Sequence, residues 1–374
     1  MNVHKALRKS FVNLRGWKTK KRYVLFESDD WGSVRIKDKD AFKFLTSKGL
    51  DLFKSRYTKF DRIEHPVDLG ELFSVLHSHK DHKGNSPVFT ANYLVANPDF
   101  KLCKEGGFKE YKYKTLNETY EEYGILNEMQ RLLFNGIDQG VWLPQYHGKE
   151  HLQPIRWLKC VNSNEYEKLA AESDSLPGIP LDESKGQYIR YNAAFDFWSI
   201  EEQEDVNYNA LKGLELFKET FGFEPISFAP SQSVVGSEVL KKLSNTGIRL
   251  NKAGAHFLPR LISNQRKMKQ EFWGYNIDCS MFVSRSNANF EPSSGPKDWV
   301  DECLWEISNA FLFNKPAVIS THRVNYIGSL SQKNRDNSLM KLNRLLTELL
   351  RKFPDVEFIH SAELAQVMIE NNGK

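Results

Sequence analysis

The chain has 374 residues, of which 40% are hydrophobic and 27% are charged, and its formal net charge is +4. This composition is typical of a soluble globular protein with a large apolar core. No apolar run approaches the roughly 18 residues of a membrane span, and the small net charge gives no indication of nucleic-acid binding.

A basic arm is predicted at residues 1–20, followed by a single domain at residues 21–374. The first 22 residues contain eight Lys or Arg, no Asp or Glu, and no apolar stretch that could be the core of a signal peptide. We interpret the arm as a solvated, partly helical leader; it could also contact an anionic membrane surface or an acidic polymer. The four cysteines lack Cys-x-x-Cys spacing and are typical of reduced thiols, so we expect a cytoplasmic protein.

Short apolar runs recur along the chain, and polar residues follow each of them. In chain order the runs cover residues 23–26, 88–95, 141–143, 226–228, 317–320 and 356–359. Short, nearly all-apolar strands are what a buried parallel sheet requires. Amphipathic segments lie between the runs, as at residues 339–353, where leucines share one face and Pro354 follows.

Alternating strands and helices predict βα units in one sheet. We expect an α/β fold, in the form of a distorted (β/α) barrel of seven parallel strands with helical insertions; an open doubly wound sheet is the alternative. The connections at residues 33–86, 97–140 and 152–220 are long, and we expect their extra helices and loops to shape a substrate cleft.

Polar residues directly after the strands are the candidates for a functional site. In a parallel barrel the carboxyl ends of all strands open on one face, and that face carries the active site. The residues are Asp29, Asp30, His147, His151, Ser231, Gln232 and His322. The sequence therefore predicts that these side chains lie together at one end of the barrel.

Residues 147–151, HGKEH, carry the sharpest of these signals. Two histidines four residues apart on a helix or a tight turn can reach one metal ion. Asp30 would complete a set of two histidines and one carboxylate, which leaves positions open for water and substrate. Adjacent residues at a strand end point in opposite directions, so Asp29 could face the substrate. The alternatives are a turn or helix cap for the two carboxylates, and surface or core positions for the histidines.

In this order the motifs resemble those of the polysaccharide deacetylases of carbohydrate esterase family four, over roughly residues 20–365. The resemblance implies a distorted barrel in which Asp29 is the catalytic base and His322 is the general acid. It also implies that Asp30, His147 and His151 hold the metal. Residues 228–231, FAPS, are similar to the third motif of the family, which forms one wall of the groove.

The chain departs from the family pattern at two positions. Trp31 stands where the family has Gly directly after the Asp pair, and Gly32 comes one residue later. Ala229 stands where the third motif has the Arg that holds and tunes the base. Arg323 is the expected substitute because it follows a strand end, and Arg285 is the alternative. The fourth motif of the family, which contains Asp and Trp, is not found in the sequence.

The remaining candidates have simpler interpretations. The histidines at positions 77, 79 and 82 are expected in a solvated loop. Glu291 could be a second carboxylate of the site, but Pro292 favours a turn or a surface position. Trp31 could stack on a sugar, whereas aromatic core packing is the alternative.

The expected function is that of a metal-dependent hydrolase, with Zn²⁺ as the divalent ion. It would remove an acetyl group, bound as N-acetyl, from an amino sugar, an oligosaccharide or a polysaccharide precursor. Trp31, Ser231, Gln232 and Arg323 are expected to contact this carbohydrate. The alternatives are a metal-independent glycoside hydrolase on the same barrel and a carbohydrate-binding barrel without catalysis.

Overall fold

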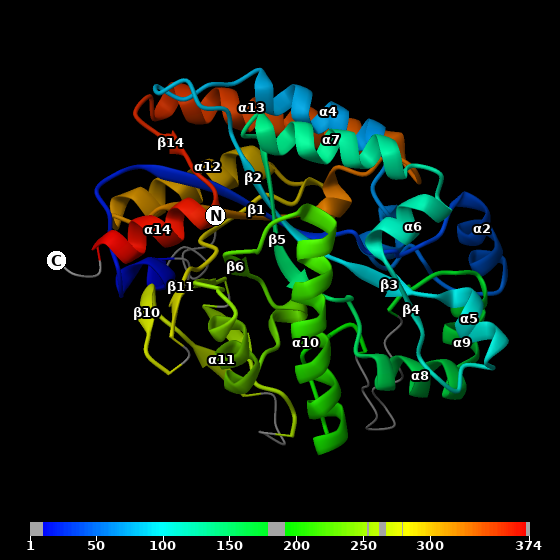
Figure 1. Ribbon diagram of the computed structural model, residues 1–374. Coiled ribbons are helices and arrows are strands. Elements are labelled where there is room, and N and C mark those ends of the chain that lie inside the picture. Colours follow the sequence, from blue (N-terminus) through cyan, green and yellow to red (C-terminus); the bar gives the residue numbers. More distant parts are fainter. Residues whose placement is uncertain (1–9, 179–190, 253, 262–266, 279, 372–374) are drawn as a thin grey trace.

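The chain folds as a distorted (β/α) barrel, as predicted, in which helices flank a curled and mostly parallel sheet (Figure 1). The computed structural model describes residues 10–178, 191–252, 254–261, 267–278 and 280–371. None of the helices within these ranges is long and apolar enough to cross a membrane.

Ten strands of the described residues form the main sheet. In spatial order they are β10 (Gly274–Asn276), β11 (Met281–Val283), β7 (Leu250–Asn251), β6 (Ser227–Phe228), β5 (Trp142–Gly148), β2 (Phe89–Leu94), β1 (Tyr23–Trp31), β13 (Ala317–His322) and β12 (Ala288–Asn289), and β14 (Glu357–Phe358) pairs with the start of β1. Every pair is parallel except β10 with β11. The run from β11 to β12 has eight parallel strands where seven were expected, because two-residue strands such as β12 are too short for an apolar pattern to reveal.

Helices surround the curled sheet. Helix α4 (Pro66–His77) contacts both α7 (Leu126–Asp138) and α13 (Gln332–Lys352), and α12 (Trp299–Leu312) lies against α13 (Figure 1). Helices α10 (Ile200–Phe221) and α11 (Ser237–Asn245) pack together, and α14 (Ser361–Asn371) contacts β6 and β7. Helix α13 contains most of the amphipathic segment predicted at 339–353, and its row of leucines is buried against the barrel.

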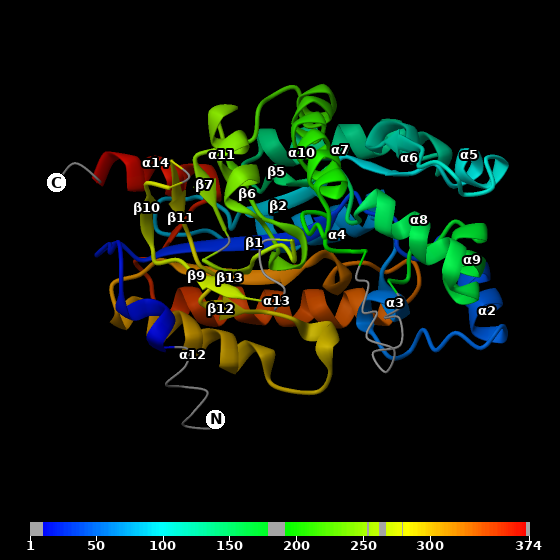
Figure 2. The same ribbon diagram turned by 90° about the horizontal axis from the view of Figure 1, so that it is seen from below.

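The three long connections carry extra elements, as the sequence predicts. The connection between β1 and β2 contains α2 (Lys39–Ser47), α3 (Arg56–Phe60) and α4. The connection between β2 and β5 contains β3 (Ala96–Pro98), α5 (Phe100–Glu105), β4 (Tyr113–Thr115), α6 (Leu116–Glu122) and α7. The connection between β5 and β6 contains α8 (Pro154–Ser163), α9 (Glu165–Glu172) and α10. Later connections hold η2 (Ser231–Ser233), β8 (Ala255–Phe257), β9 (Met268–Gln270), η3 (Pro292–Ser294) and η4 (Arg323–Asn325). Figure 2 shows α2, α3, α8 and α9 gathered at one end of the barrel, away from the chain termini.

Part of the predicted basic arm packs against the barrel. Asn13 is 1% exposed, donates a hydrogen bond to Asn309 and accepts one from Asn287. The ammonium group of Lys315 donates to the backbone carbonyl groups of Arg15 and Gly16, each at 2.9 Å. Residues 13–16 are therefore anchored to the barrel, while residues 1–9 of the arm lie outside the described ranges.

Candidate functional site

The end of β1 is irregular at the two aspartates. The pairing of β1 with β2 shifts register between Ser28 and Trp31, and Asp30 adopts a left-handed backbone conformation with φ of 78°. Asp tolerates this conformation better than most residues, and such an irregularity redirects the side chains of a strand. As a result Asp29 and Asp30 line the same cavity, although neighbours in a regular strand would face opposite ways.

Gly32 is required directly after this irregularity. Its φ is +81°, and a Cβ atom there would lie 2.2 Å from the carbonyl oxygen of Leu94. Trp31, the residue inserted before it, is fully buried and makes an edge contact with Trp142 at 4.7 Å between ring centroids. Its indole nitrogen donates to Ser28. The glycine of the family pattern is thus displaced by one residue, and the extra residue packs into the core.

His147 is fixed at the end of β5 by a backbone group. Its Nδ1 donates a hydrogen bond of 2.6 Å to the carbonyl oxygen of Ala229, and its Nε2 faces Asp30. A hydrogen bond on one ring nitrogen sets the tautomer and the orientation of a metal-binding histidine. The residue at the Arg position of the family motif therefore contributes through its main chain.

His151 follows in a tight turn, and the two residues before it anchor that turn. Lys149 is buried and donates to Asn209 of α10 at 2.5 Å. Glu150 is also buried and accepts a hydrogen bond from Tyr111 at 2.9 Å. Both side chains point into protein contacts, so the turn between the two histidines is held from inside the fold.

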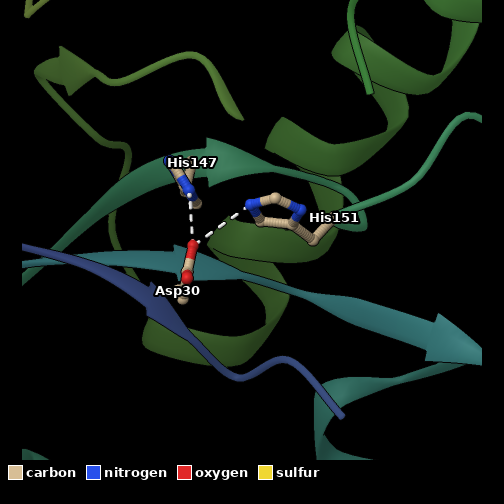
Figure 3. Close-up of side chains that lie close together, drawn as sticks. All are labelled: Asp30, His147 and His151. Carbon is tan, nitrogen blue, oxygen red and sulfur yellow. Dashed lines mark hydrogen bonds and ion pairs between the residues drawn. The ribbon is translucent and has the colours of Figure 1, made fainter. Parts of the chain in front are cut away.

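Asp30, His147 and His151 converge on one point (Figure 3). Oδ1 of Asp30 lies 3.3 Å from Nε2 of His147 and 3.1 Å from Nε2 of His151. The three ligand atoms lie within 4.8 Å of one another, and all three residues are buried. This geometry places two imidazole nitrogens and one carboxylate oxygen where a single ion could contact all of them.

The protonation states at this set also suit a metal ion. Burial, reinforced by the nearby charge of Arg35, lowers the pKa of His151 to about 4. Burial opposes ionisation of Asp30, but His151, His147 and Arg35 outweigh it and hold the pKa of this carboxyl well below its usual value. Metal ligands must be neutral histidine and ionised carboxylate, and these are the forms that the surroundings of His151 and Asp30 favour at neutral pH. The donor set fits a divalent ion with open coordination positions.

Asp29 is held by a lysine from another strand end. The ammonium group of Lys252, directly after β7, lies 2.7 Å from Oδ1 of Asp29, and Asn92 donates to the same oxygen at 2.7 Å. Burial opposes ionisation of Asp29, but Lys252, followed by His147 and His322, lowers the pKa of its carboxyl. Burial raises the pKa of neighbouring Glu27 to about 7. Lys252 is therefore the cation that contacts Asp29, where the sequence interpretation expected an arginine.

His322 lies directly beside Asp29, because the two residues are paired across β13 and β1. Nδ1 of His322 donates to Oε1 of Glu291 at 2.5 Å, and the other carboxylate oxygen accepts from Arg56 and Asn325. Burial would lower the pKa of His322, but the charge of Glu291 outweighs burial and raises it. His322 is therefore a partly buried histidine whose pKa is raised by a carboxylate, which favours its protonated form.

Replacing Glu291 by glutamine is expected to lower the pKa of His322. The amide keeps a hydrogen-bonding side chain but removes the negative charge, so burial then dominates. An NMR titration of the His322 ring in wild type and E291Q measures this directly. The control is D51N, which removes a carboxylate from the same cavity without a contact to His322. An equal His322 pKa in wild type and E291Q would show that Glu291 does not set it.

The five residues predicted for catalysis and metal binding line one cavity of about 710 Å³. They are Asp29, Asp30, His147, His151 and His322. Gln232 also lines this cavity, with left-handed backbone (φ 52°) in the 3-10 turn η2. Left-handed conformation at Asp30 and Gln232 places backbone strain at the site, where such strain is commonly found.

Three residues predicted to contact substrate lie elsewhere in the described structure. Trp31 is in the aromatic core. The hydroxyl group of Ser231 is fully buried and accepts from the backbone of Ala194. Arg323 is 0% exposed, and its guanidinium group contacts Asp61 and Glu64 at 3.1 and 2.7 Å. Arg285, the alternative partner for Asp29, donates instead to the backbone of Glu271.

Lys252 and Arg56 are functional candidates that the sequence interpretation missed, and Glu291 is one that it considered but placed in a turn or on the surface. Lys252 follows the two-residue strand β7, so the rule that strand ends carry the site would have selected it had this strand been recognised. Glu291 is 8% exposed, not on the surface as its neighbouring proline suggested. No local pattern marks Arg56, which comes from the long connection after β1.

Comparison with known proteins finds similar solved structures but no match in sequence. No protein-family model matches the chain, and no curated protein matches it. Among solved structures it is similar to a chain described as a polysaccharide deacetylase from Mycobacterium smegmatis (10% identity, TM-score 0.47, covering 96% of this chain and 94% of that one). Another from Pseudomonas aeruginosa has 8% identity and a TM-score of 0.45, covering 95% and 93% of the two chains. The 4-alpha-glucanotransferase from Thermococcus litoralis has 10% identity and a TM-score of 0.45, covering 93% of this chain and 40% of that one.

The motifs of the chain resemble those of polysaccharide deacetylases, and the solved structures similar to it include chains described in that way. A fold of this kind hosts different reactions, so the activity has to be argued from the site itself.

Proposed function

We propose that this protein is a metal-dependent hydrolase that removes an N-acetyl group from an amino sugar or from a glycan that contains one. The observation that carries the proposal is the buried Asp30, His147 and His151 set, flanked in one cavity by Asp29 and His322. Two histidines, one carboxylate, a separate base and a separate acid are the groups that acyl hydrolysis requires.

Asp30, His147 and His151 would hold the ion, with Zn²⁺ as the proposed metal. When bound, such an ion polarises a carbonyl group and lowers the pKa of water. Asp29 is the group that accepts the proton of the attacking water, because Lys252 and Asn92 keep its carboxylate ionised and fixed. Neither of these partners is a metal ligand in this scheme, so the base is oriented independently of the ion.

His322 would donate the proton to the departing amine. Glu291 raises the pKa of the ring, which favours its protonated form, and because it accepts from Nδ1 it leaves Nε2 to reach the substrate. An amine leaves more readily when it is protonated, so a charged imidazole at this position suits amide cleavage. Asp29 and His322 are paired residues on neighbouring strands, so a base and an acid at these positions would lie beside the same substrate.

The two alternative functions are less well supported by the contacts of the site. A glycoside hydrolase needs a carboxylic acid as proton donor. Burial opposes ionisation of Glu291, but His322, followed by Arg56, outweighs it and lowers the pKa of this carboxyl. A barrel without catalysis was suggested by Ala229 in place of Arg, but Lys252 supplies a cation to Asp29.

The metal content of the purified protein tests the proposal first. We expect about one divalent ion per chain in wild type, and its loss in D30A and H151A, since each variant removes one of three ligands. Acetate release from N-acetylated sugars should disappear with the metal. H77A is the matched control, because His77 is exposed and bonds only to Gln139 in the described structure.

Elemental analysis by mass spectrometry gives both the identity and the amount of the metal. Unchanged metal content in D30A and H151A, with the proteins folded by circular dichroism, would contradict the assignment of these ligands. A metal other than zinc would correct the proposed ion without moving the site.

A further inference from the structure

Two insertions join each other beside the candidate site. The connection after β1 contributes α2 with the residues on either side of it, and the connection after β5 contributes α9 and the residues that follow it. Figure 2 shows α2 beside α9. They share an apolar cluster that is separate from the main core. Its buried members are Ile36, Ala41, Leu45, Leu50, Leu52 and Ala170. Because residues of both insertions build one cluster, they form a single packed layer, which we call the wall.

Polar contacts also connect the two parts of the wall. The backbone N–H of Leu176 donates to the carbonyl oxygen of Arg35 at 2.6 Å. Lys37 forms an ion pair with Asp174 at 2.7 Å, and its backbone N–H donates to the hydroxyl group of Ser175 at 3.1 Å. The two contacts of Lys37 join residues that are 137 and 138 positions apart in the sequence. The wall is therefore cross-linked by backbone and side-chain bonds as well as by apolar packing.

The wall reaches the metal ligands. Arg35 lines the cavity, is 6% exposed, and brings its guanidinium group to 3.7 Å from Oδ2 of Asp30. Gly49 and Tyr166 line the cavity from the two insertions, and a Cβ atom on Gly49 would lie 3.5 Å from the hydroxyl group of Tyr166. The two insertions therefore meet at the edge of the cavity itself.

We propose that this wall limits the site to a small acetylated sugar or to the terminal sugar of a chain. The proposal rests on the hydrolase function given above and names its substrate class. A glycan that bound through internal residues would have to continue past its reacting sugar in both directions. Among the described residues the wall lines the cavity beside a metal ligand, so a sugar chain that continued on this side would have to cross the wall.

The size and lining of the cavity support a single small ligand. Its volume of about 710 Å³ falls in the range of pockets that hold one small molecule, roughly 300–1,000 Å³. Tyr57 also lines it, and its ring contacts the His322 ring edge to face at 5.6 Å between centroids. An aromatic ring beside the proton donor can pack against one sugar unit.

Chain-length series test this proposal on the metal-loaded, full-length protein. The probes are N-acetylglucosamine, its β-1,4-linked dimer and its hexamer. We expect acetate from all three, with kcat/KM levelling off by the dimer, and mass spectrometry should show loss of a single acetyl group from one end of the hexamer. Acetyl loss from internal positions, or a kcat/KM that rises more than about tenfold from dimer to hexamer, would overturn the proposal.

Calorimetric binding of the same three probes separates this proposal from the proposed reaction. An affinity that stops rising at one or two sugar units, without acetate release, would support the wall as the limit on ligand length. The same result would contradict the hydrolase function. Acetate release along the whole hexamer would support the function and overturn the wall. Neither binding nor release of acetate from any probe would overturn both.

A variant of the wall identifies the cause of the length limit. Y166A removes a side chain that is 45% exposed and reaches over Gly49, and Y208A removes an exposed tyrosine of α10 away from the cavity. We expect internal acetyl groups of the hexamer to become accessible in Y166A and to stay protected in Y208A. Identical product patterns in wild type, Y166A and Y208A would show that this edge of the wall does not set the limit.

Discussion

D29N is expected to lower kcat by about 10²- to 10⁴-fold, the range by which a positioned general base accelerates a reaction, while the metal content stays at the wild-type level. The asparagine keeps the shape of the side chain but cannot accept a proton from water. Asp30, the predicted ligand, is unchanged. Steady-state rates and elemental analysis on the same protein preparation measure both quantities.

The control for this prediction is D51N. Asp51 lines the same cavity and carries the same charge, but it is exposed and lies near Lys54 rather than near the metal set. We expect D51N to keep its kcat within about tenfold of wild type, well short of the loss for a general base. A D29N protein with nearly wild-type kcat would remove Asp29 from the mechanism, and D29N without metal would make it a ligand instead.

The fold could be predicted because its central strands carry a strong local signal. All six residues of β2 are buried, and a mostly apolar run of that length is typical of a parallel strand that is covered on both faces. The same reasoning placed Asp29, His147 and His322 at strand ends, and the structure brings these three side chains to one cavity. The topology therefore predicts much of the site, because the carboxyl ends of parallel strands lie at the same end of the barrel.

The local backbone at the site could not be predicted in the same way. Regular alternation would send Asp29 and Asp30 to opposite faces, but the left-handed φ of Asp30 lets both reach the cavity. The displaced glycine, Gly32, is the sequence sign of this irregularity. Its cause is a close approach to Leu94, a residue 62 positions away that no local pattern relates to it.

Charge partners were the least predictable part of the site. Arg323 was expected to hold Asp29, but the 3-10 turn after β13 directs its side chain into the protein, where Asp61 and Glu64 neutralise it. Glu64 also accepts from the backbone N–H of Gly32 at 3.0 Å, so Arg323 supports the turn that follows Asp30. The residue that does hold Asp29, Lys252, is 223 positions away in the sequence.

K252M is expected to move the acidic limb of the pH dependence of kcat/KM to higher pH. In wild type the charge of Lys252 counteracts burial and lowers the pKa of the Asp29 carboxyl. Without that charge the pKa rises, so the carboxylate takes up its proton at a higher pH and is lost as a base there. Each pH unit by which the limb moves lowers the rate on that limb about tenfold. The loss should therefore exceed about tenfold at acidic pH and shrink as the pH rises.

K252R is the matched variant, because it keeps a cation beside Asp29. We expect its acidic limb to stay near that of wild type, even if the larger guanidinium group lowers kcat. Both variants should keep the metal, since Lys252 contacts Asp29 and Glu27 rather than the predicted ligands. A K252M profile that loses activity equally at every pH would instead indicate that Lys252 positions Asp29 without tuning its protonation. An unaltered K252M profile would leave the base dependent on Asn92 and the two nearby histidines alone.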